Sequence, residues 1–186
     1  MRPENDCRRC RLCEGRARLV MPDGDPRSPL ALVGEAPGAK EDEEGRPFVG
    51  RSGKLLDRLL EEEGLSRPMV YITNTVKCRP PGNRAPTQEE MDACFPFLEE
   101  ELADRKVIIT LGRSAARDLL RRDVKMRDEV NRPQEITIRG SKKLLIPAYH
   151  PAASIYNAKV KDSLRETFRI ARTCLEDRRT FLSKGT

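Results

Sequence analysis

The spacing of the cysteines is the clearest chemical signal in the sequence. Cys7 and Cys10 form a C-x2-C pair, and Cys13 follows closely. Such a turn directs two thiols toward one metal site, and a tetrahedral site needs two more ligands, which Cys78 and Cys94 can supply. We therefore predict that Cys7, Cys10, Cys78 and Cys94 hold an iron–sulfur cluster or zinc. The spacing leaves open that Cys13 replaces one of them, or that the thiols are isolated and buried.

A glycine-rich turn follows the first apolar segment. Residues 30–33 are of strand type and run into Gly34-Glu35-Ala36-Pro37-Gly38. Glycines let backbone N–H groups approach a ligand that a Cβ would obstruct. Phe48 comes soon after, between Pro47 and a Val-Gly pair, where a flat base can stack on it. This order predicts a buried strand that opens into a ligand loop, although an ordinary turn with a buried Phe gives the same pattern.

Two further polar residues stand at the ends of apolar segments. Asn74 ends the segment 70–74, and its carboxamide offers a donor and an acceptor, enough to read one edge of a base. His150 follows the segment 144–149 and is the only histidine in the chain. Taken singly, a turn asparagine and a structural histidine are the commoner interpretations.

Strand and helix patterns alternate between these residues. We expect strands at residues 30–33, 70–74, 107–112 and 144–149. We expect helices at residues 52–64, 87–102, 113–122 and 159–182. Ser52 can cap the first helix and Gly64 can end it, and Thr87 begins a capping box. Residues 124–140 are polar, and a hairpin or an extended excursion fits them equally.

This alternation predicts an α/β fold: a three-layer sandwich with a central four-stranded parallel sheet flanked by helices, formed by residues 1–186 as a single domain. In such sheets ligands bind beyond the carboxyl ends of the strands. The turn at 34–38, Asn74 and His150 all follow those ends, so we expect them to converge. Convergence favours a shared site over the local interpretation of each residue.

Composition limits the class of protein. The net charge of +6 favours a polyanionic partner, but Lys and Arg are spread along the chain, so the signal is weak. No apolar signal region and no run of about eighteen apolar residues occurs. We therefore expect a cytoplasmic protein that does not bind membranes, and a monomer. Thiols in that compartment stay reduced, which favours metal ligands over disulfides.

Taken together, the motifs resemble family-4 uracil-DNA glycosylases, the iron–sulfur type found in thermophilic bacteria and archaea. The matching stretches are Cys7-x2-Cys10, GEAPG at 34–38, GRPFVGRSG at 45–53, YITNTVKCRPP at 71–81, Cys94 and HPA at 150–152. Each is weak alone, but the ordered set is specific and spans most of the chain. The resemblance implies an enzyme that hydrolyses the N-glycosidic bond of deoxyuridine in DNA, releasing uracil and leaving an abasic site. It also implies a [4Fe-4S] cluster on Cys7, Cys10, Cys78 and Cys94, with Cys13 and Cys174 as spares.

The residues and the resemblance together suggest roles in a base-flipping reaction. The uridine must leave the helix before its bond is accessible. Phe48 is expected to stack on the flipped ring, Asn74 to pair with its O4 and N3–H edge, and His150 to donate to O2 of the departing uracil. The resemblance places Glu41 beside C5, where it excludes thymine; without it, a solvated acid is the simpler interpretation. Glu35 is the candidate for orienting water, and the backbone of Gly34, Ala36 and Gly38 is expected to line the base.

Contacts to DNA outside the base are less well specified. Arg79 and Arg84 are expected near phosphates, and a sliding clamp is a candidate additional partner. Residues 126–139 and the continuation after His150 depart from the family pattern, so either Ile155 or Tyr156 is the candidate wedge. Two alternatives stay open: a non-catalytic nucleic-acid binding module stabilised by a cluster or zinc, and a redox protein. Neither requires Asn74, Phe48 and His150 to converge.

Overall fold

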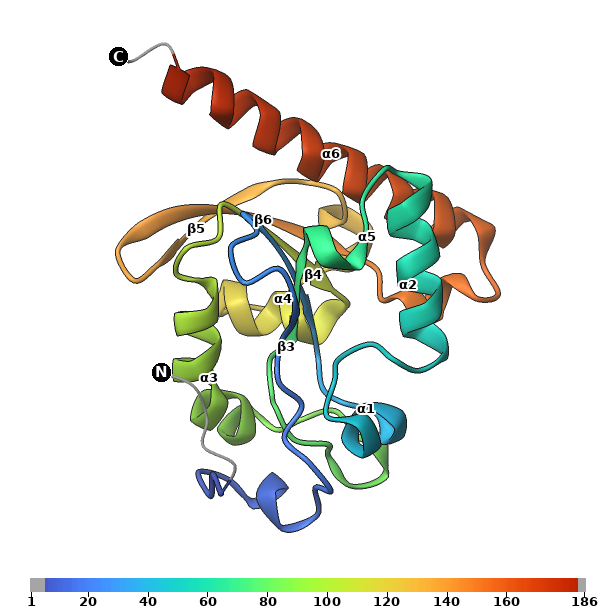
Figure 1. Ribbon diagram of the computed structural model, residues 1–186, viewed down its shortest axis with the longest axis vertical. Helices are drawn as coiled ribbons and strands as arrows, with labels where there is room; N and C mark the ends of the chain where they lie inside the picture. Colours follow the sequence, from blue (N-terminus) through green and yellow to red (C-terminus); the bar gives the residue numbers. More distant parts are fainter. Residues whose placement is uncertain (1–5, 184–186) are drawn as a thin grey trace.

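A six-stranded mixed sheet forms the centre of the computed structural model, which describes residues 6–183 (Figure 1). Its strands are β1 (Asp23–Gly24), β2 (Leu30–Gly34), β3 (Tyr71–Asn74), β4 (Val107–Leu111), β5 (Gln134–Ile138) and β6 (Ser141–Ala148). Across the sheet they lie in the order β1-β3-β2-β4-β6-β5. Strands β3, β2, β4 and β6 are mutually parallel, whereas β1 and β5 pair antiparallel at the two edges.

The expected four-stranded parallel sheet is therefore right for the central strands and wrong for the sheet as a whole. The edge strand β5 comes from the polar stretch 124–140. Arg139, with φ of 49°, and Gly140, with φ of 76°, form the two-residue turn that leads from β5 into β6, the conformation that tight hairpins favour. A five-residue strand that is half exposed buries too little apolar surface to leave a clear signal, and β1 has only two residues.

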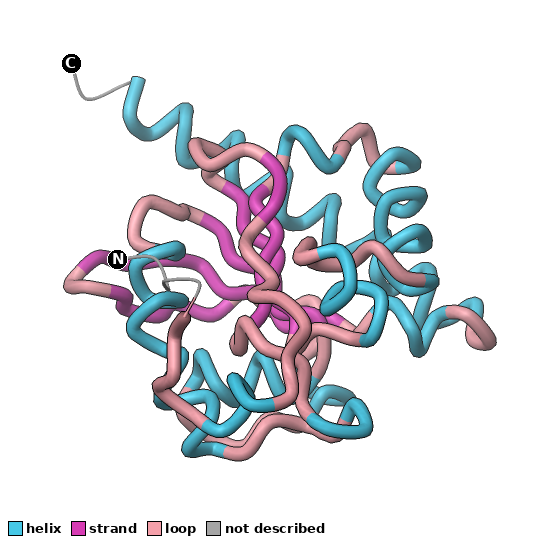
Figure 2. Tube along the Cα trace, turned by 60° about the horizontal axis from the view of Figure 1, so that its bottom comes forward, coloured by secondary structure: helices cyan, strands magenta, loops and turns pink. Residues whose placement is uncertain are grey.

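Helices cover both faces of the sheet (Figure 2). They are α1 (Ala39–Glu44), α2 (Arg51–Glu62), α3 (Gln88–Leu102), α4 (Arg113–Leu120), α5 (Met126–Glu129) and α6 (Ala158–Ser183), with short 3-10 turns η1 (Arg11–Glu14), η2 (Arg67–Met69), η3 (Pro81–Asn83) and η4 (Pro151–Ser154). Leu30 and Leu32 pack toward α2 and α6, whereas Ala31 and Val33 pack toward α3 and α4. This alternation follows from the two-residue period of a strand, and it confirms the three-layer prediction.

Local signals at the helix ends were mostly interpreted correctly. Thr87 and Glu90 form the predicted capping box, in which Glu90 N–H donates to Thr87 Oγ1 at 3.3 Å and Thr87 N–H donates to Glu90 Oε2 at 2.8 Å. Gly64, with φ of 70°, follows the end of α2. The Ser52 cap was wrong, because α2 begins at Arg51 and its N-cap is Gly50, with no side-chain cap. Among the described residues, no helix is long and apolar enough to cross a bilayer.

The order of the strands creates a crevice at the end of β2. The chain leaves β2, crosses through α2 and returns as β3 on one side of it, whereas β4 lies on the other side and leads into α4 in the opposite layer. At such a switch point the loops after neighbouring strands diverge, which leaves room for a ligand between them. The crevice therefore opens where Gly34, Asn74 and Gly112 end or follow their strands.

Candidate active site

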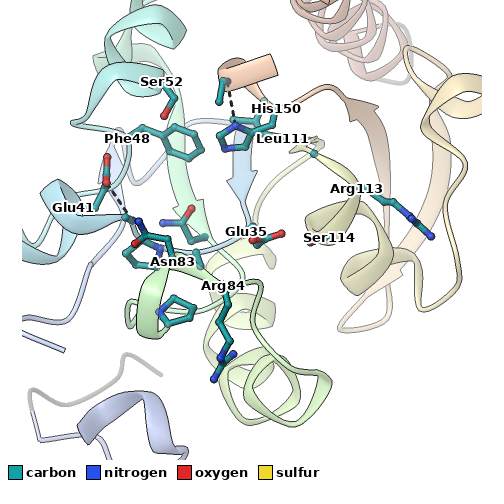
Figure 3. Close-up of a pocket in the computed structure, with 17 residues that line it drawn as sticks. Glu35, Glu41, Phe48, Ser52, Asn83, Arg84, Leu111, Arg113, Ser114 and His150 are labelled. Atoms are coloured by element: carbon teal, nitrogen blue, oxygen red, sulfur yellow. Dashed lines mark hydrogen bonds between the residues drawn. The ribbon is translucent and has the colours of Figure 1, made fainter. Parts of the chain in front are cut away.

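A cavity of about 670 Å³ lies at the carboxyl ends of β2, β3 and β4 (Figure 3). The predicted residues that line it are Glu35, Ala36, Gly38, Glu41, Phe48, Asn74 and His150. Gly34 lies next to two of them, since a Cβ on it would stand 2.4 Å from Oδ1 of Asn74 and 2.6 Å from Cζ of Phe48. The fold thus brings all the predicted substrate-site residues together, while their roles stay predictions.

Phe48 is fixed in a constrained backbone conformation. Its φ of 54° lies in the left-handed region, which is uncommon for a residue with a side chain. Nη2 of Arg67 donates to its carbonyl at 2.6 Å, and a Cβ on Gly53 would stand only 1.7 Å from that oxygen. Its ring stacks against the imidazole of His150, with centroids 5.9 Å apart and planes at 29°. Such strain persists only where surrounding contacts enforce it, so the ring has a set place in the cavity wall.

Asn74 offers an unused amide at the end of β3. The residue is 3% exposed, and its backbone carbonyl accepts a hydrogen bond from Nζ of Lys77 at 2.8 Å. Its carboxamide lines the cavity but has no hydrogen-bond partner within the described part of the chain. Because its polar atoms face the open cavity and bond to no other residue there, this group is suited to pair with a ligand that supplies both an acceptor and a donor.

His150 has a defined tautomer. Its Nδ1 accepts a hydrogen bond from the Ala152 N–H at 3.2 Å, so the neutral ring carries its hydrogen on Nε2. Burial lowers the pKa of His150 below its ordinary value, although the carboxylates of Glu35 and Glu41 act in the opposite direction. The ring is therefore neutral near pH 7 and has one N–H to donate. Gly112, with φ of 102°, lets the backbone after β4 lie close to His150, since a Cβ there would stand 3.3 Å from Cβ of His150.

Glu41 is a structural anchor as well as part of the cavity wall. Its Oε1 accepts from the N–H groups of Val49 at 2.9 Å and Gly50 at 2.8 Å, and its Oε2 accepts from Gly38 at 3.2 Å. The alternative of a solvated acid is therefore wrong. These bonds also occupy the Gly38 amide, whereas the Ala36 amide has no acceptor among the described residues. Of these two amides in the turn, the one at Ala36 is available to a ligand.

The turn that carries Glu35 is pinned to the end of β3. The Glu35 carbonyl accepts from Oγ1 of Thr75 at 2.6 Å and from the amide of Val76 at 3.3 Å. Its carboxylate lines the same cavity and interacts electrostatically with His150. The position is compatible with the predicted role in orienting water.

Several lining residues were not predicted. They are Pro37, Ser52, Pro80, Asn83, Leu111, Gly112, Arg113, Ser114 and Ala152. Residues 112–114 could have been predicted from the sequence, because they follow the carboxyl end of β4 just as the turn at 34–38 follows that of β2. Arg84 does line the cavity, where Glu90 holds its guanidinium through two bonds of 2.8 and 2.6 Å. Arg79 does not line it, and donates to Oδ1 of Asn83 at 2.7 Å instead.

A second, smaller cavity is lined by thiols. Its cysteines are Cys7, Cys10, Cys13, Cys78 and Cys94. Cys78 and Cys94 are buried, and burial raises the pKa of the Cys94 thiol to about 11. Leu19 and Phe97 belong to the apolar cluster around these sulfurs, and Nη1 of Arg16 donates to Sγ of Cys78 at 3.4 Å. Sulfur ligands in an apolar shell fit an iron–sulfur or zinc group. Cys174 packs instead against the core beneath α2 and α6.

Comparison with known proteins assigns the family. Residues 21–172 match the model of the uracil DNA glycosylase superfamily, so the chain belongs to that superfamily. It also belongs to the type-4 family, as the resemblance predicted, because relatives of that name are 38–43% identical over most of the chain. It is 40% identical over 179 residues to the Type-4 uracil-DNA glycosylase of Saccharolobus solfataricus, covering 92% of this chain and 83% of that one. It is 39% identical over 180 residues to the Type-4 uracil-DNA glycosylase of Thermotoga maritima, covering 96% and 90%. The match to the Type-5 enzyme of Thermus thermophilus, 42% identical, covers only 56% and 55% of the two chains.

Proposed function

We propose that this protein excises uracil from DNA by hydrolysing the bond between N1 of the base and C1′ of the sugar, leaving an abasic site. The observation that carries the proposal is the convergence of three different groups on one cavity: an aromatic ring, an unpaired amide and a neutral imidazole N–H, from Phe48, Asn74 and His150. A flipped uracil needs a surface to stack on, a partner for its polar edge and a donor for its leaving oxygen. A module that only binds nucleic acid needs no such set.

Asn74 reads the base in this proposal. Uracil presents an acceptor at O4 and a donor at N3, and one carboxamide can satisfy both. Cytosine presents the opposite pattern at those atoms, so it would leave the Asn74 amide mismatched. Glu41 forms the wall near C5, and its three backbone hydrogen bonds keep it from yielding to the methyl group of thymine.

His150 and Ala36 stabilise the leaving group. As the N1–C1′ bond breaks, its electron pair stays on uracil and positive charge develops on the sugar. Nε2–H of His150 donates to O2 of the uracil anion, and the unpaired Ala36 amide, which lines the same cavity, contributes a second hydrogen bond. Water oriented by Glu35 then adds its oxygen to C1′, and its proton leaves through solvent.

Residues around the cavity contact the DNA backbone and fill the space that the flipped base leaves in the helix. Arg84 and Arg113 line it, where they pair with Glu90 and Asp123, and we expect both to turn toward the phosphates when DNA binds. Tyr156 is 86% exposed, and Nη1 of Arg51 donates to its hydroxyl at 3.2 Å, so it is our choice over Ile155 as the wedge. Uracil-containing DNA is the partner; a monomeric state and a sliding-clamp partner stay predictions.

We assign the thiol cavity to a [4Fe-4S] cluster on Cys7, Cys10, Cys78 and Cys94. Four thiolates can hold either such a cluster or a zinc ion, and the resemblance to the iron–sulfur type of glycosylase favours the cluster. When bound, it would cross-link the amino-terminal segment to the start of the proline-rich loop and to α3.

The first test is incubation of the protein with an oligonucleotide that carries one deoxyuridine, followed by alkali and a sizing gel. Matched strands with thymine or cytosine at that position are the controls. We expect cleavage at uracil alone. No cleavage by protein with its cluster intact would move the assignment to a binding module.

The residue roles are tested by Asn74→Ala and His150→Ala. We expect each to lower the single-turnover rate by about 10²–10³-fold, because each removes a group that acts on the flipped base. Binding of DNA that already carries an abasic site should persist. A variant that turns over at a near-normal rate would show that its residue does not belong to the site.

A further inference from the structure

We propose that the buried ion pair of Lys77 and Glu101 positions Asn74 and links it to the thiol cavity. The proposal rests on the assignment of Asn74 as the base-reading residue. Lys77 does not touch the substrate cavity; it acts through Asn74, so it is a positioning residue.

The ion pair is buried, and its two side chains bond to each other and to residues at the end of β3. The side chains of Lys77 and Glu101 are 1% and 6% exposed, and Nζ lies 2.7 Å from Oε2 of Glu101. Nζ also donates to Oγ1 of Thr73 at 2.6 Å and to the carbonyl of Asn74 at 2.8 Å. The Thr73 hydroxyl in turn donates to Glu101 Oε2 at 2.8 Å. The three donors of the ammonium are therefore all used, and one of them holds the Asn74 peptide directly.

Stability alone is a weak reason for this arrangement. Transferring an ammonium and a carboxylate out of water is costly, and apolar side chains of similar volume are often at least as stable. Oε1 of Glu101 is buried with no hydrogen-bond partner, so the pair is not fully satisfied. What an apolar pair cannot reproduce is a donor aimed at the Asn74 carbonyl.

Both partners sit on segments that carry cluster thiols. Lys77 precedes Cys78, its backbone hydrogen-bonds with Cys94, and it lines the thiol cavity. Glu101 lies about two turns beyond Cys94 on the same helix, α3. A group bound by the thiols would fix the two segments that the ion pair joins, and the pair would carry that placement to the end of β3. The link is short, because the backbone of Lys77 faces the thiols while its side chain reaches Asn74.

The test separates positioning from stability. In the double variant Lys77→Met/Glu101→Leu both charges are removed together, so no unpaired charge is left buried, and we expect the variant to fold. We expect its single-turnover rate on uracil to fall by about 10–100-fold, because the Asn74 peptide loses its donor. Affinity for abasic DNA and the visible absorption of the cluster should stay as in the wild type. A crystal structure of the double variant should show the Asn74 carboxamide displaced.

Two controls complete the experiment. Lys143 is another buried lysine, bonded to the carbonyl of Ala103 and absent from both cavity linings, so Lys143→Met should leave the rate per folded molecule within about twofold. Asn74→Ala tests whether Asn74 is the base-reading residue, on which the proposal rests. If Asn74→Ala is inactive but the folded double variant keeps the wild-type rate and Asn74 geometry, the positioning role is overturned and the proposed function stands. If Asn74→Ala is itself fully active, the assignment of Asn74 fails first.

Discussion

The substrate cavity and the thiol cavity differ in the polar groups that they leave without protein partners. The cavity at the strand ends is open, about 670 Å³, and presents the Asn74 amide and the Nε2–H of His150 without protein partners among the described residues. The thiol cavity is smaller, and buried Cys78 and Cys94 lie there among apolar side chains such as Leu19 and Phe97. Open polar groups suit a ligand that arrives and leaves. Sulfurs in an apolar shell suit a group that stays.

The two cavities are also held in place by different means. The substrate cavity is built from turns at the ends of strands that are themselves fully buried. The amino-terminal side of the thiol cavity is a loop segment. It is held by hydrogen bonds such as Ala17 N–H to both carboxylate oxygens of Asp42, at 3.0 and 3.1 Å, and Val20 N–H to the Lys77 carbonyl at 2.8 Å, and by the packing of Leu12 and Leu19. We infer that the first cavity is preformed by the fold, whereas the second depends on the group it holds.

We expect the largest effect from Cys94→Ser, which tests whether the thiol cavity depends on the group it holds. Removing one ligand should abolish the visible absorption and lower the free energy of unfolding by more than about 5 kcal/mol, because binding energy at structural metal sites is folding energy. Denaturant unfolding followed by circular dichroism measures this change. Cys174→Ser is the matched control, since Cys174 lies outside the thiol cavity. Equal stability of the two variants would mean that the thiol cavity needs no occupant.

Gly34→Ala tests whether the substrate cavity is preformed. A Cβ would stand 2.4 Å from Oδ1 of Asn74 and 2.6 Å from the ring of Phe48, so both must move. We expect a loss of about 10²-fold in single-turnover rate with the cluster retained. Gly15→Ala is the control, because a Cβ there meets nothing within 4 Å. Retention of more than a third of the wild-type rate by Gly34→Ala would argue for a cavity that adapts to its ligand.

The pH dependence of stability gives the smallest effect. Burial lowers the pKa of His150 in the folded protein, so between that value and the ordinary pKa of about 6.5 the unfolded chain binds more protons than the native state. This contribution to stability is present above about pH 6.5 and is lost as pH falls through the folded pKa, with a slope of at most about 1.4 kcal/mol per pH unit. Urea midpoints of the wild type and His150→Gln, measured from pH 8 to 5, should converge toward low pH. Parallel curves would contradict the lowered pKa.

Much of the fold and the site was accessible from the sequence because the signals were local. The apolar run at 107–111 and the capping box at Thr87 each depend on residues within a few positions, and both were placed correctly. The convergence of Gly34, Asn74 and His150 followed from one general rule about parallel sheets. For residues 124–140 the hairpin was one of two open interpretations, and strand β5 was not assigned because its residues gain their structure from pairing with β6, not from their own pattern.

What depends on distant neighbours was decided only by the tertiary structure. Nothing near Glu41 in the sequence indicates that three amides will hold its carboxylate, and nothing near Lys77 indicates a fully buried ammonium. The tautomer of His150 is set by the nearby amide of Ala152 once the η4 turn forms, whereas its lowered pKa is set by burial in the folded chain. The sequence therefore specified which chemical groups the site contains. Packing of remote segments decided their protonation, their orientation and which of their polar atoms are left for a ligand, because these properties depend on distance and burial and not on order along the chain.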